Sequence, residues 1–242
     1  MTESVNGSQC RIRIDAAYYG RRQVLFNADV ILEPKKVVGL FGHNGAGKSS
    51  LVNAAFGISP PIWEGSVCIE GRTMSKNSPE ERVRSGMVLV PQGRGVFPSL
   101  TVSENFLLAH GAIKSGSSMD RKRLETIFEL MPILRDKWND KAGSLSGGQQ
   151  QFVSVGRALL QNPRYLILDE PSVGLAPKLV EDMMKLIQVV STQDGVGVLL
   201  VEQNVSQALQ VIERAYVMRS GQITGEYTQE QLRESEYLWH LA

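Results

Sequence analysis

Short apolar runs alternate with longer amphipathic stretches along most of the chain. The apolar runs, rich in Val, Leu and Ile, predict strands at 10–14, 24–32, 37–41, 66–70, 87–90, 165–169 and 196–201. Several of them are apolar at every position, as parallel strands covered on both faces tend to be. Helical patterns lie between them at 48–56, 79–85, 103–110, 121–131, 147–161, 177–192 and 205–213. This alternation predicts an α/β protein with a mainly parallel sheet.

Three segments depart from simple alternation. The N-terminal third opens with two or three strands and no helix between them, which predicts an antiparallel β flap. Residues 101–161 are helical throughout, which predicts a helical lobe inserted into the sheet domain. The chain closes with a hairpin and a small helix, whose Thr228 and Gln231 fit a capping box. We expect one domain, in which 1–92 and 162–242 form the sheet core and about 93–161 the helical subdomain.

Helix starts carry local signals of their own. Pro79 and Pro177 stand near two predicted helix starts, where a missing N–H costs little. Asp120, before RKRLETIFELM, and Ser146, before GGQQQ, are expected to be N-caps.

The composition indicates where the protein is located and which kinds of partner it does not bind. The 242 residues carry a net charge of +1, which argues against a protein that wraps nucleic acid. No apolar run approaches the length of roughly 18 residues that spans a bilayer, and the polar start MTESVNGSQ does not resemble a signal peptide. We therefore expect a cytoplasmic protein. Cys10 and Cys68 are expected to be packed free thiols, since they lack metal-ligand spacing.

Residues 42–49, GHNGAGKS, match the P-loop pattern G-x-x-x-x-G-K-[ST] and follow the strand-like VVGLF. The glycines let the backbone curl so that successive N–H groups point at phosphate. Lys48 supplies a charge for the β- and γ-phosphates, and the Ser49 hydroxyl supplies a ligand for Mg²⁺. The helix that begins there presents its positive end to the same anion.

YLILDE, residues 165–170, supplies the second half of the predicted site. An apolar strand ending in Asp169 suits a carboxylate that holds Mg²⁺ through its water shell. Glu170 is then placed to orient or deprotonate the attacking water. Together the two motifs predict a P-loop nucleotidase.

Residues 144–151, SLSGGQQQ, indicate which kind of nucleotidase this is, since the N-K-x-D guanine reader of GTPases is absent from the sequence. Ser146, Gly147 and Gly148 open a helix, so a hydroxyl, bare backbone N–H groups and the helix dipole form a second anion-binding terminus. LSGGQQQ, shortly before YLILDEP, resembles the signature of ATP-binding-cassette (ABC) ATPases, and the resemblance covers essentially the whole chain.

The resemblance implies a fold and a set of residues. The implied fold is a P-loop NTPase with a RecA-like, mainly parallel core, an N-terminal antiparallel β subdomain and an inserted α-helical subdomain. The residues implied to bind ATP are Tyr19, Gly42, Asn44, Gly45, Gly47, Lys48, Ser49, Ser50, Ser146, Gly147 and Gly148. Ser49, Gln92 and Asp169 would bind Mg²⁺, and Gln92, Glu170 and Gln203 would serve catalysis. Tyr19 would stack on adenine, with Tyr18 as its rival and a core aromatic as the alternative.

Gln203, in VLLVEQN, occupies the position of the family's switch residue, which is usually a His that touches the γ-phosphate. None of the three histidines, His43, His110 and His240, lies at that position. Glutamine can donate a hydrogen bond to phosphate but carries no titratable proton. We therefore expect Gln203 to sense the γ-phosphate without adding a histidine-like limb to the pH–rate profile.

PQGRGVFPSLTVSENF, DEPSVGLAP and VEQN together resemble the LivF-type ATPases of hydrophobic-amino-acid and amide importers. This implies a second, LivG-type ATPase or a second copy of this chain, two integral membrane permease subunits and a periplasmic binding protein. The residues 172–177 would pass between the two ATPases, and a cytoplasmic position against the inner face of the membrane follows. IERAYV and the ending EYLWHLA depart from the family pattern, so no role is carried over to them.

Arg94, Val96 and Phe97 are the candidates for contact with a permease helix; the alternative is that Val96 and Phe97 only pack the helical lobe. The rival functions are a soluble ABC ATPase that acts on nucleic acid or ribosomes, and a regulatory module without turnover. The first usually carries two cassettes or long coiled-coil insertions, and this chain has one compact cassette. The second is disfavoured by the presence of Gln92 and Glu170.

Overall fold

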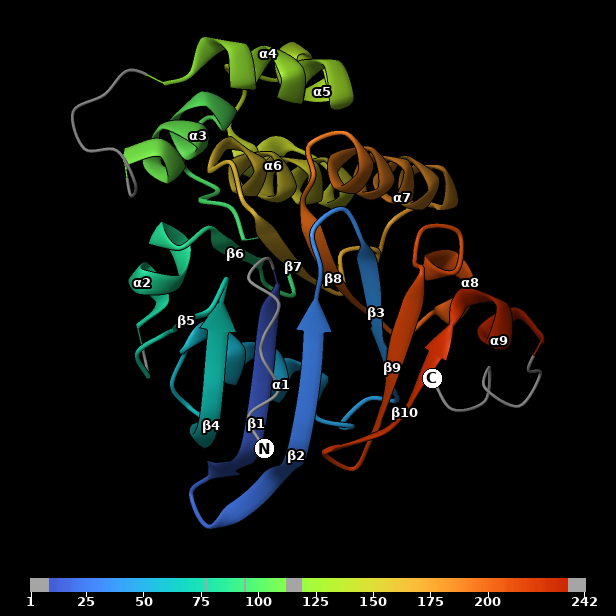
Figure 1. Cartoon of the computed structure of the whole chain (residues 1–242). Coiled ribbons are helices and arrows are strands. Elements are labelled where there is room, and N and C mark those ends of the chain that lie inside the picture. Colours follow the sequence, from blue (N-terminus) through green and yellow to red (C-terminus); the bar gives the residue numbers. More distant parts are fainter. Residues whose placement is uncertain (1–8, 77, 94, 112–118, 235–242) are drawn as a thin grey trace.

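The structure is a computed structural model that describes residues 9–76, 78–93, 95–111 and 119–234 (Figure 1). In chain order its elements are β1 (Cys10–Tyr19), β2 (Arg22–Leu32), β3 (Val37–Phe41), α1 (Lys48–Phe56), β4 (Ile62–Ile69), β5 (Arg72–Thr73), α2 (Pro79–Arg84), β6 (Met87–Val90), α3 (Val102–Gly111), α4 (Arg121–Leu130), α5 (Pro132–Asp136), the 3₁₀ turn η1 (Ala142–Ser144), α6 (Gly147–Leu160), β7 (Tyr165–Asp169), α7 (Pro177–Thr192), β8 (Gly197–Glu202), α8 (Val205–Ala208), β9 (Arg214–Arg219), β10 (Gln222–Thr228) and α9 (Gln229–Glu234).

A six-stranded sheet forms the centre of the fold, in the order β10-β9-β3-β8-β7-β6. Its neighbours from β9 to β6 pair in parallel, and only the β9–β10 hairpin is antiparallel. Every residue of β3, β7 and β8 is buried, as expected for strands covered on both faces. The predicted α/β class with a mainly parallel sheet is confirmed.

A second sheet, in the order β2-β1-β4-β5, is antiparallel throughout. It confirms the predicted N-terminal β flap. Its first strand continues to Tyr19, beyond the predicted end at residue 14, because it hydrogen-bonds to β2 on one side and β4 on the other. Tertiary pairing therefore extends this strand past the apolar pattern that identified it.

Two apolar cores lie on opposite faces of the central sheet. One joins α1 to both sheets through residues such as Leu51, Leu40 and Ile12. The other joins the opposite face to α6 and α7, and continues without a break into α3 and α4 through Phe106 and Phe128. The helical segment therefore shares its core with the sheet. The predicted subdomain boundaries near residues 92 and 162 stay a prediction.

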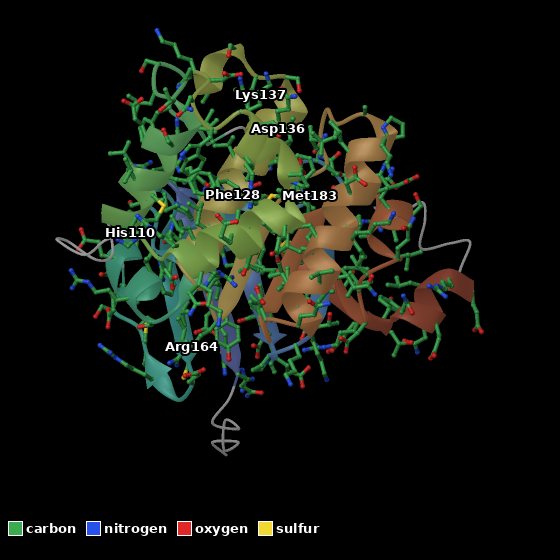
Figure 2. The ribbon with its side chains drawn as sticks, turned by 90° about the horizontal axis from the view of Figure 1, so that it is seen from above. His110, Phe128, Asp136, Lys137, Arg164 and Met183 are labelled. Atoms are coloured by element: carbon green, nitrogen blue, oxygen red, sulfur yellow. The ribbon has the colours of Figure 1, made fainter. Side chains whose placement is uncertain are left out.

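Figure 2 looks down on the helical layer, with Phe128 of α4 and Met183 of α7 near its centre, and both side chains belong to the same core. Two predicted N-caps are confirmed here: the Asp120 carboxylate accepts a hydrogen bond from the Arg123 backbone N–H (3.1 Å), and Ser146 forms a full capping box with Gln149. Pro79 and Pro177 begin α2 and α7, as predicted. None of the helices in the described part of the chain has the length and apolar character needed to cross a bilayer.

The predicted helix at 205–213 is wrong in length, because α8 ends at Ala208. The backbone N–H of Glu213 donates to the Val37 carbonyl of β3 (3.0 Å), and Ile212 is buried. Pairing of this segment with β3, which leads into β9, therefore prevails over a longer helix. The predicted capping box of α9 is confirmed, with Thr228 N–H to Gln231 Oε1 at 2.8 Å and Gln231 N–H to Thr228 Oγ1 at 3.3 Å.

Cys10 and Cys68 are free thiols, as predicted. Cys10 lies at the buried start of β1, and burial raises its pKa to about 12. It therefore packs as a small apolar group rather than as a reactive thiolate.

Candidate active site

Four parallel strands end at one edge of the central sheet, and the predicted motifs follow those ends. Residue Phe41 of β3 pairs with Glu202 of β8, and Val201 of β8 pairs with Asp169 of β7. The P-loop follows β3, and Gln92 follows β6. In α/β sheets, ligands bind at the carboxyl ends of the strands. This edge therefore gathers residues from four distant parts of the sequence.

The P-loop requires glycine where the backbone is crowded or left-handed. A Cβ on Gly42 would lie 2.3 Å from the Met218 carbonyl oxygen, and Gly47 has φ of 108°. The loop leads directly into α1, so backbone N–H groups at the helix start point into the same space. Lys48 is buried, with 4% of its surface exposed, and its ammonium donates to the Gly42 carbonyl at 2.6 Å. The predicted anion-binding loop thus has the geometry that its sequence indicates.

Glu170 stands in the left-handed region, with φ of 51°, immediately after β7. Its side chain is buried among three donors. Gln92 Nε2 donates to one carboxylate oxygen at 2.7 Å, and Gln203 Nε2 donates to the other at 2.7 Å. The Lys48 ammonium lies 3.7 Å from that second oxygen. The structure therefore brings together the three residues predicted for catalysis.

Gln203 also links Glu170 to the P-loop. Its Nε2 donates to Asn44 Oδ1 at 2.6 Å as well as to Glu170. A side chain from the end of β8 is thus in contact with both the phosphate loop and the carboxylate.

Asp169, the last residue of β7, is buried beneath the P-loop. Burial raises the pKa of its carboxyl, a hydrogen bond with the Ser49 side chain opposes the rise, Glu170 adds to it and Lys48 again opposes it. Its Oδ1 is buried without a hydrogen-bond partner among the described residues. A carboxylate oxygen in this position is suited to a cation or to water held by one.

A pocket of about 650 Å³ opens above the P-loop. Eight of the predicted site residues line it: Asn44, Gly45, Gly47, Lys48, Ser49, Ser50, Gln92 and Glu170. Of the other predicted residues, Gly42 and Asp169 are buried close to it. Gln203 reaches it through its hydrogen bonds to Asn44 and Glu170.

Sequence reasoning missed one wall of this pocket: Arg22, Gln23, Val24, Phe26, Ser220 and Gly221. Gly221 joins the two segments, because its N–H donates to the Ala46 carbonyl at 2.7 Å and its carbonyl accepts from the Phe26 N–H at 2.8 Å. No motif marks these residues. The only sequence signal near them was Tyr19, which pairs with Arg22 at the hairpin turn and is not itself among the lining residues.

The signature residues lie away from this pocket. Ser146 is the N-cap of α6, and no residue of 146–148 is among the described residues that line the P-loop pocket. A Cβ on Gly148 would lie 2.4 Å from a methyl of Leu179, so α6 packs closely against α7 at this point. Ser146 instead borders a separate cavity of about 630 Å³ between α4–α5 and α6–α7. Within one chain, the signature residues are therefore not part of the P-loop pocket.

The family model described as "ABC transporter" matches residues 25–173. The high-affinity branched-chain amino acid transport ATP-binding protein BraG of Pseudomonas aeruginosa is 39% identical over 208 residues, which cover 86% of this chain and 88% of BraG. The probable branched-chain amino acid transport ATP-binding protein LivF of Archaeoglobus fulgidus is 33% identical over 220 residues, 91% of this chain and 92% of LivF.

The lipopolysaccharide export system ATP-binding protein LptB of Escherichia coli K12 is 33% identical over 226 residues, 92% of this chain and 91% of LptB. Among solved structures, an ATP-binding cassette of an ABC transporter in its ADP conformation superposes with a TM-score of 0.79 at 28% identity, over 94% of this chain and 93% of that one. The matched family, these relatives and the P-loop architecture agree with one another. The chain belongs to the ABC transporter family, as one of its ATP-binding subunits with ATPase activity.

Proposed function

We propose that this chain is the ATP-hydrolysing subunit of an importer for branched-chain or other hydrophobic amino acids, or for related amides. The observation that carries the ATPase part is the position of Glu170, held by Gln92 and Gln203 beside Lys48 of the P-loop. The transport part is supported by the similarity to BraG and LivF, whose names describe branched-chain amino acid transport. The cassette is peripheral on the cytoplasmic face of the membrane, held there by permease subunits.

ATP binds along the P-loop. The backbone N–H groups of the loop and α1 receive the phosphates, with Lys48 on the β- and γ-phosphates. Asn44 and Ser50 line the same pocket, and Tyr19 stacks on adenine from the neighbouring hairpin turn. The Lys48 ammonium bonds the neutral Gly42 carbonyl and lies 3.7 Å from the Glu170 carboxylate. When ATP binds, the ammonium moves to the phosphates, which offer it a direct charge-assisted hydrogen bond.

Ser49, Gln92 and Asp169 would hold Mg²⁺ at this site. The buried Asp169 Oδ1, which lacks a partner among the described residues, and the Asp169–Ser49 hydrogen bond fit this arrangement. When bound, the ion offsets the negative charge of the transferring phosphoryl group.

Glu170 orients and deprotonates the attacking water. Its buried carboxylate lies within reach of the P-loop, and the two amides that donate to it fix its orientation without protonating it. Gln203 contacts the γ-phosphate from the end of β8, since its amide already reaches Asn44 of the P-loop.

The proposed role of Gln203 predicts a particular pH–rate profile. Gln203→Ala is expected to lower kcat roughly 10-fold, the order expected from losing one hydrogen bond to a charged group. Any acid limb of the wild-type profile should remain, because an amide does not titrate. Gln203→His should add a limb near the ordinary histidine pKa of about 6.5. Phosphate release between pH 5 and 9 measures both; an acid limb that disappears in Gln203→Ala would contradict the role.

The ATP site is completed by a second ATPase. Because Ser146, Gly147 and Gly148 lie outside the P-loop pocket of their own chain, their helix terminus is available to a nucleotide on another subunit. That subunit is a LivG-type ATPase or a second copy of this chain. The complete transporter adds two integral membrane permeases and a periplasmic substrate-binding protein.

The permease contacts the surface formed by Phe97, Leu107 and Leu108, all of which are exposed apolar side chains on or just before α3. Two contacts fix the position of Phe97. Arg157 of α6 stacks on the Phe97 ring at 5.2 Å, and the buried Asn105 side chain bonds both the backbone N–H and the carbonyl of Phe97. Val96 packs against the core instead, as the alternative interpretation of that residue expected. Arg94 lies outside the described residues.

Charge placed on this surface tests the transporter assignment. The double variant Leu107→Glu and Leu108→Glu should lower the amount of chain that co-purifies with membranes at least about 10-fold, because each carboxylate would have to be desolvated in an apolar interface. Basal ATP hydrolysis should change by less than about 2-fold, since neither residue lines the P-loop pocket. Glu181→Gln, on the exposed face of α7, is the control. Undiminished co-purification would contradict this surface.

Similarity to LptB favours a second candidate, the ATPase of an exporter. The integral subunits that co-purify distinguish the two candidates, since an importer brings a periplasmic binding protein with them. Recovery of ATPase activity only in the membrane-free fraction would favour the third, a soluble ABC ATPase that acts on nucleic acid or ribosomes.

A further inference from the structure

Glu202 is a buried carboxylate that none of the steps above uses. It is the last residue of β8, beside Gln203, and only 1% of its surface is exposed. Burial raises the pKa of its carboxyl, and the charge of Glu170 adds to the rise. A buried carboxylate is unfavourable unless its oxygens are well hydrogen-bonded, so its partners indicate what it does.

Two of the hydrogen bonds to Glu202 come from Ser172, in the segment after β7. Glu202 Oε1 accepts a hydrogen bond from the Ser172 backbone N–H at 3.0 Å, and the Ser172 side chain bonds the same carboxyl. The backbone N–H of Gln203 supplies a further hydrogen bond. The carboxylate therefore ties the tip of β8 to a residue two positions beyond Glu170.

This tie fixes Glu170 from its C-terminal side. On the other side, the Glu170 N–H donates to the Val201 carbonyl of β8 at 2.9 Å. Glu170 itself has φ of 51°, a conformation that costs free energy for a residue with a side chain and persists only where its surroundings impose it. Glu202 and Val201, adjacent on one strand, thus hold both ends of the Glu170–Ser172 turn.

We propose that Glu202 is a positioning residue for ATP hydrolysis: as the acceptor of the Ser172 N–H, it holds the turn that aims the Glu170 carboxylate at the attacking water. This inference rests on the proposed role of Glu170 as the base. It predicts that the length of the Glu202 side chain and its ability to accept hydrogen bonds are required, whereas its charge is not. The donors that it meets are the neutral groups of Ser172 and Gln203.

Three substitutions separate reach from charge. Glu202→Gln keeps an acceptor oxygen at the same reach, and kcat should stay within about 3-fold of wild type. Glu202→Asp keeps the charge but shortens the side chain by one methylene, and kcat should fall roughly 10-fold. Glu202→Met removes the acceptor and should lower kcat at least about 30-fold, in line with the cost of a misplaced catalytic group. Binding of a non-hydrolysable ATP analogue should stay within about 3-fold in all three, because the P-loop is unchanged.

The order of the variants is the decisive result, and thermal melts confirm that each variant compared is folded. A purely structural role would lower melting temperature and analogue binding together with kcat. Glu202→Asp and Glu202→Gln preserve the test if Glu202→Met does not fold. Higher kcat in Glu202→Asp than in Glu202→Gln, or wild-type kcat in every folded variant, would overturn the inference while Glu170→Gln still blocks turnover. Turnover by Glu170→Gln would instead overturn the role of Glu170, and this inference with it.

Discussion

Glu170→Gln is expected to lower kcat for ATP hydrolysis at least about 100-fold, the lower range of what a positioned general base contributes. The amide has nearly the volume of the carboxylate but cannot accept the proton of the attacking water. ATP affinity should stay within about 3-fold of wild type, because Lys48, Ser49 and the loop backbone receive the phosphates without Glu170. Phosphate release and analogue binding, measured on the same preparation, give the two values.

Glu181→Gln is a matched control, since it makes the same chemical change on the exposed face of α7. It should leave both values unchanged. If Glu170→Gln lost analogue binding as strongly as turnover, the carboxylate would be part of the binding site rather than the base. If it kept more than about a tenth of the wild-type kcat, proton transfer to Glu170 would not be needed.

Gly147→Asp is expected to abolish turnover, by at least about 100-fold, while leaving the chain folded. Gly147 is the first residue of α6, where an acidic side chain stabilises a helix through its dipole. The same carboxylate would face the γ-phosphate of ATP on the other subunit, and two like charges would be brought together when the site closes. Turnover should therefore fail without a loss of stability.

Arg121→Asp provides the comparison, because it places an aspartate at the first position of α4, another helix of the same lobe. Phosphate release, thermal melting and analogue binding should separate the two variants. We expect binding to persist in both, since Gly147 does not line the P-loop pocket of its own chain. Wild-type turnover in Gly147→Asp would show that the start of α6 does not meet nucleotide.

The parts of the site that carry their own chemistry could be predicted from the sequence. The P-loop glycines are required by the crowded backbone, since a Cβ on Gly42 would lie 2.3 Å from the Met218 carbonyl oxygen. Their spacing can therefore be recognised in the sequence before the fold is known. Asp169 and Gln92 follow apolar runs whose carboxyl ends meet at one edge of a parallel sheet.

The other wall of the pocket could not be predicted, because its contacts are made by the backbone and by pairing between distant strands. Arg22, Val24 and Gly221 line the pocket, and the Gly221 N–H donates to the Ala46 carbonyl of the P-loop. Backbone hydrogen bonds leave little trace in side-chain chemistry. The early end of α8 has the same origin, since Glu213 is drawn into pairing with β3.

The stretch VLLVEQN contains both features that the sequence predicts and features that only the structure reveals. Its apolar part predicts a buried strand, and the structure places it as β8 in the centre of the sheet. The three residues of its polar end contact four partners: Glu202 bonds Ser172, Gln203 bonds Glu170 and Asn44, and Asn204 accepts a hydrogen bond from Ser206. The sequence alone identified Gln203 through its position in a family pattern. The part played by Glu202 follows only from the structure.

The proposed mechanism requires that this chain hydrolyse ATP at a P-loop site whose base is Glu170. The most direct test incubates wild type and Glu170→Gln with Mg²⁺ and ATP, removes free nucleotide, and identifies the nucleotide that stays bound. We predict ADP on the wild-type chain and intact ATP on Glu170→Gln, with no phosphate released by either when the metal is chelated. ADP on Glu170→Gln, formed at the wild-type rate, would show that Glu170 is not the base.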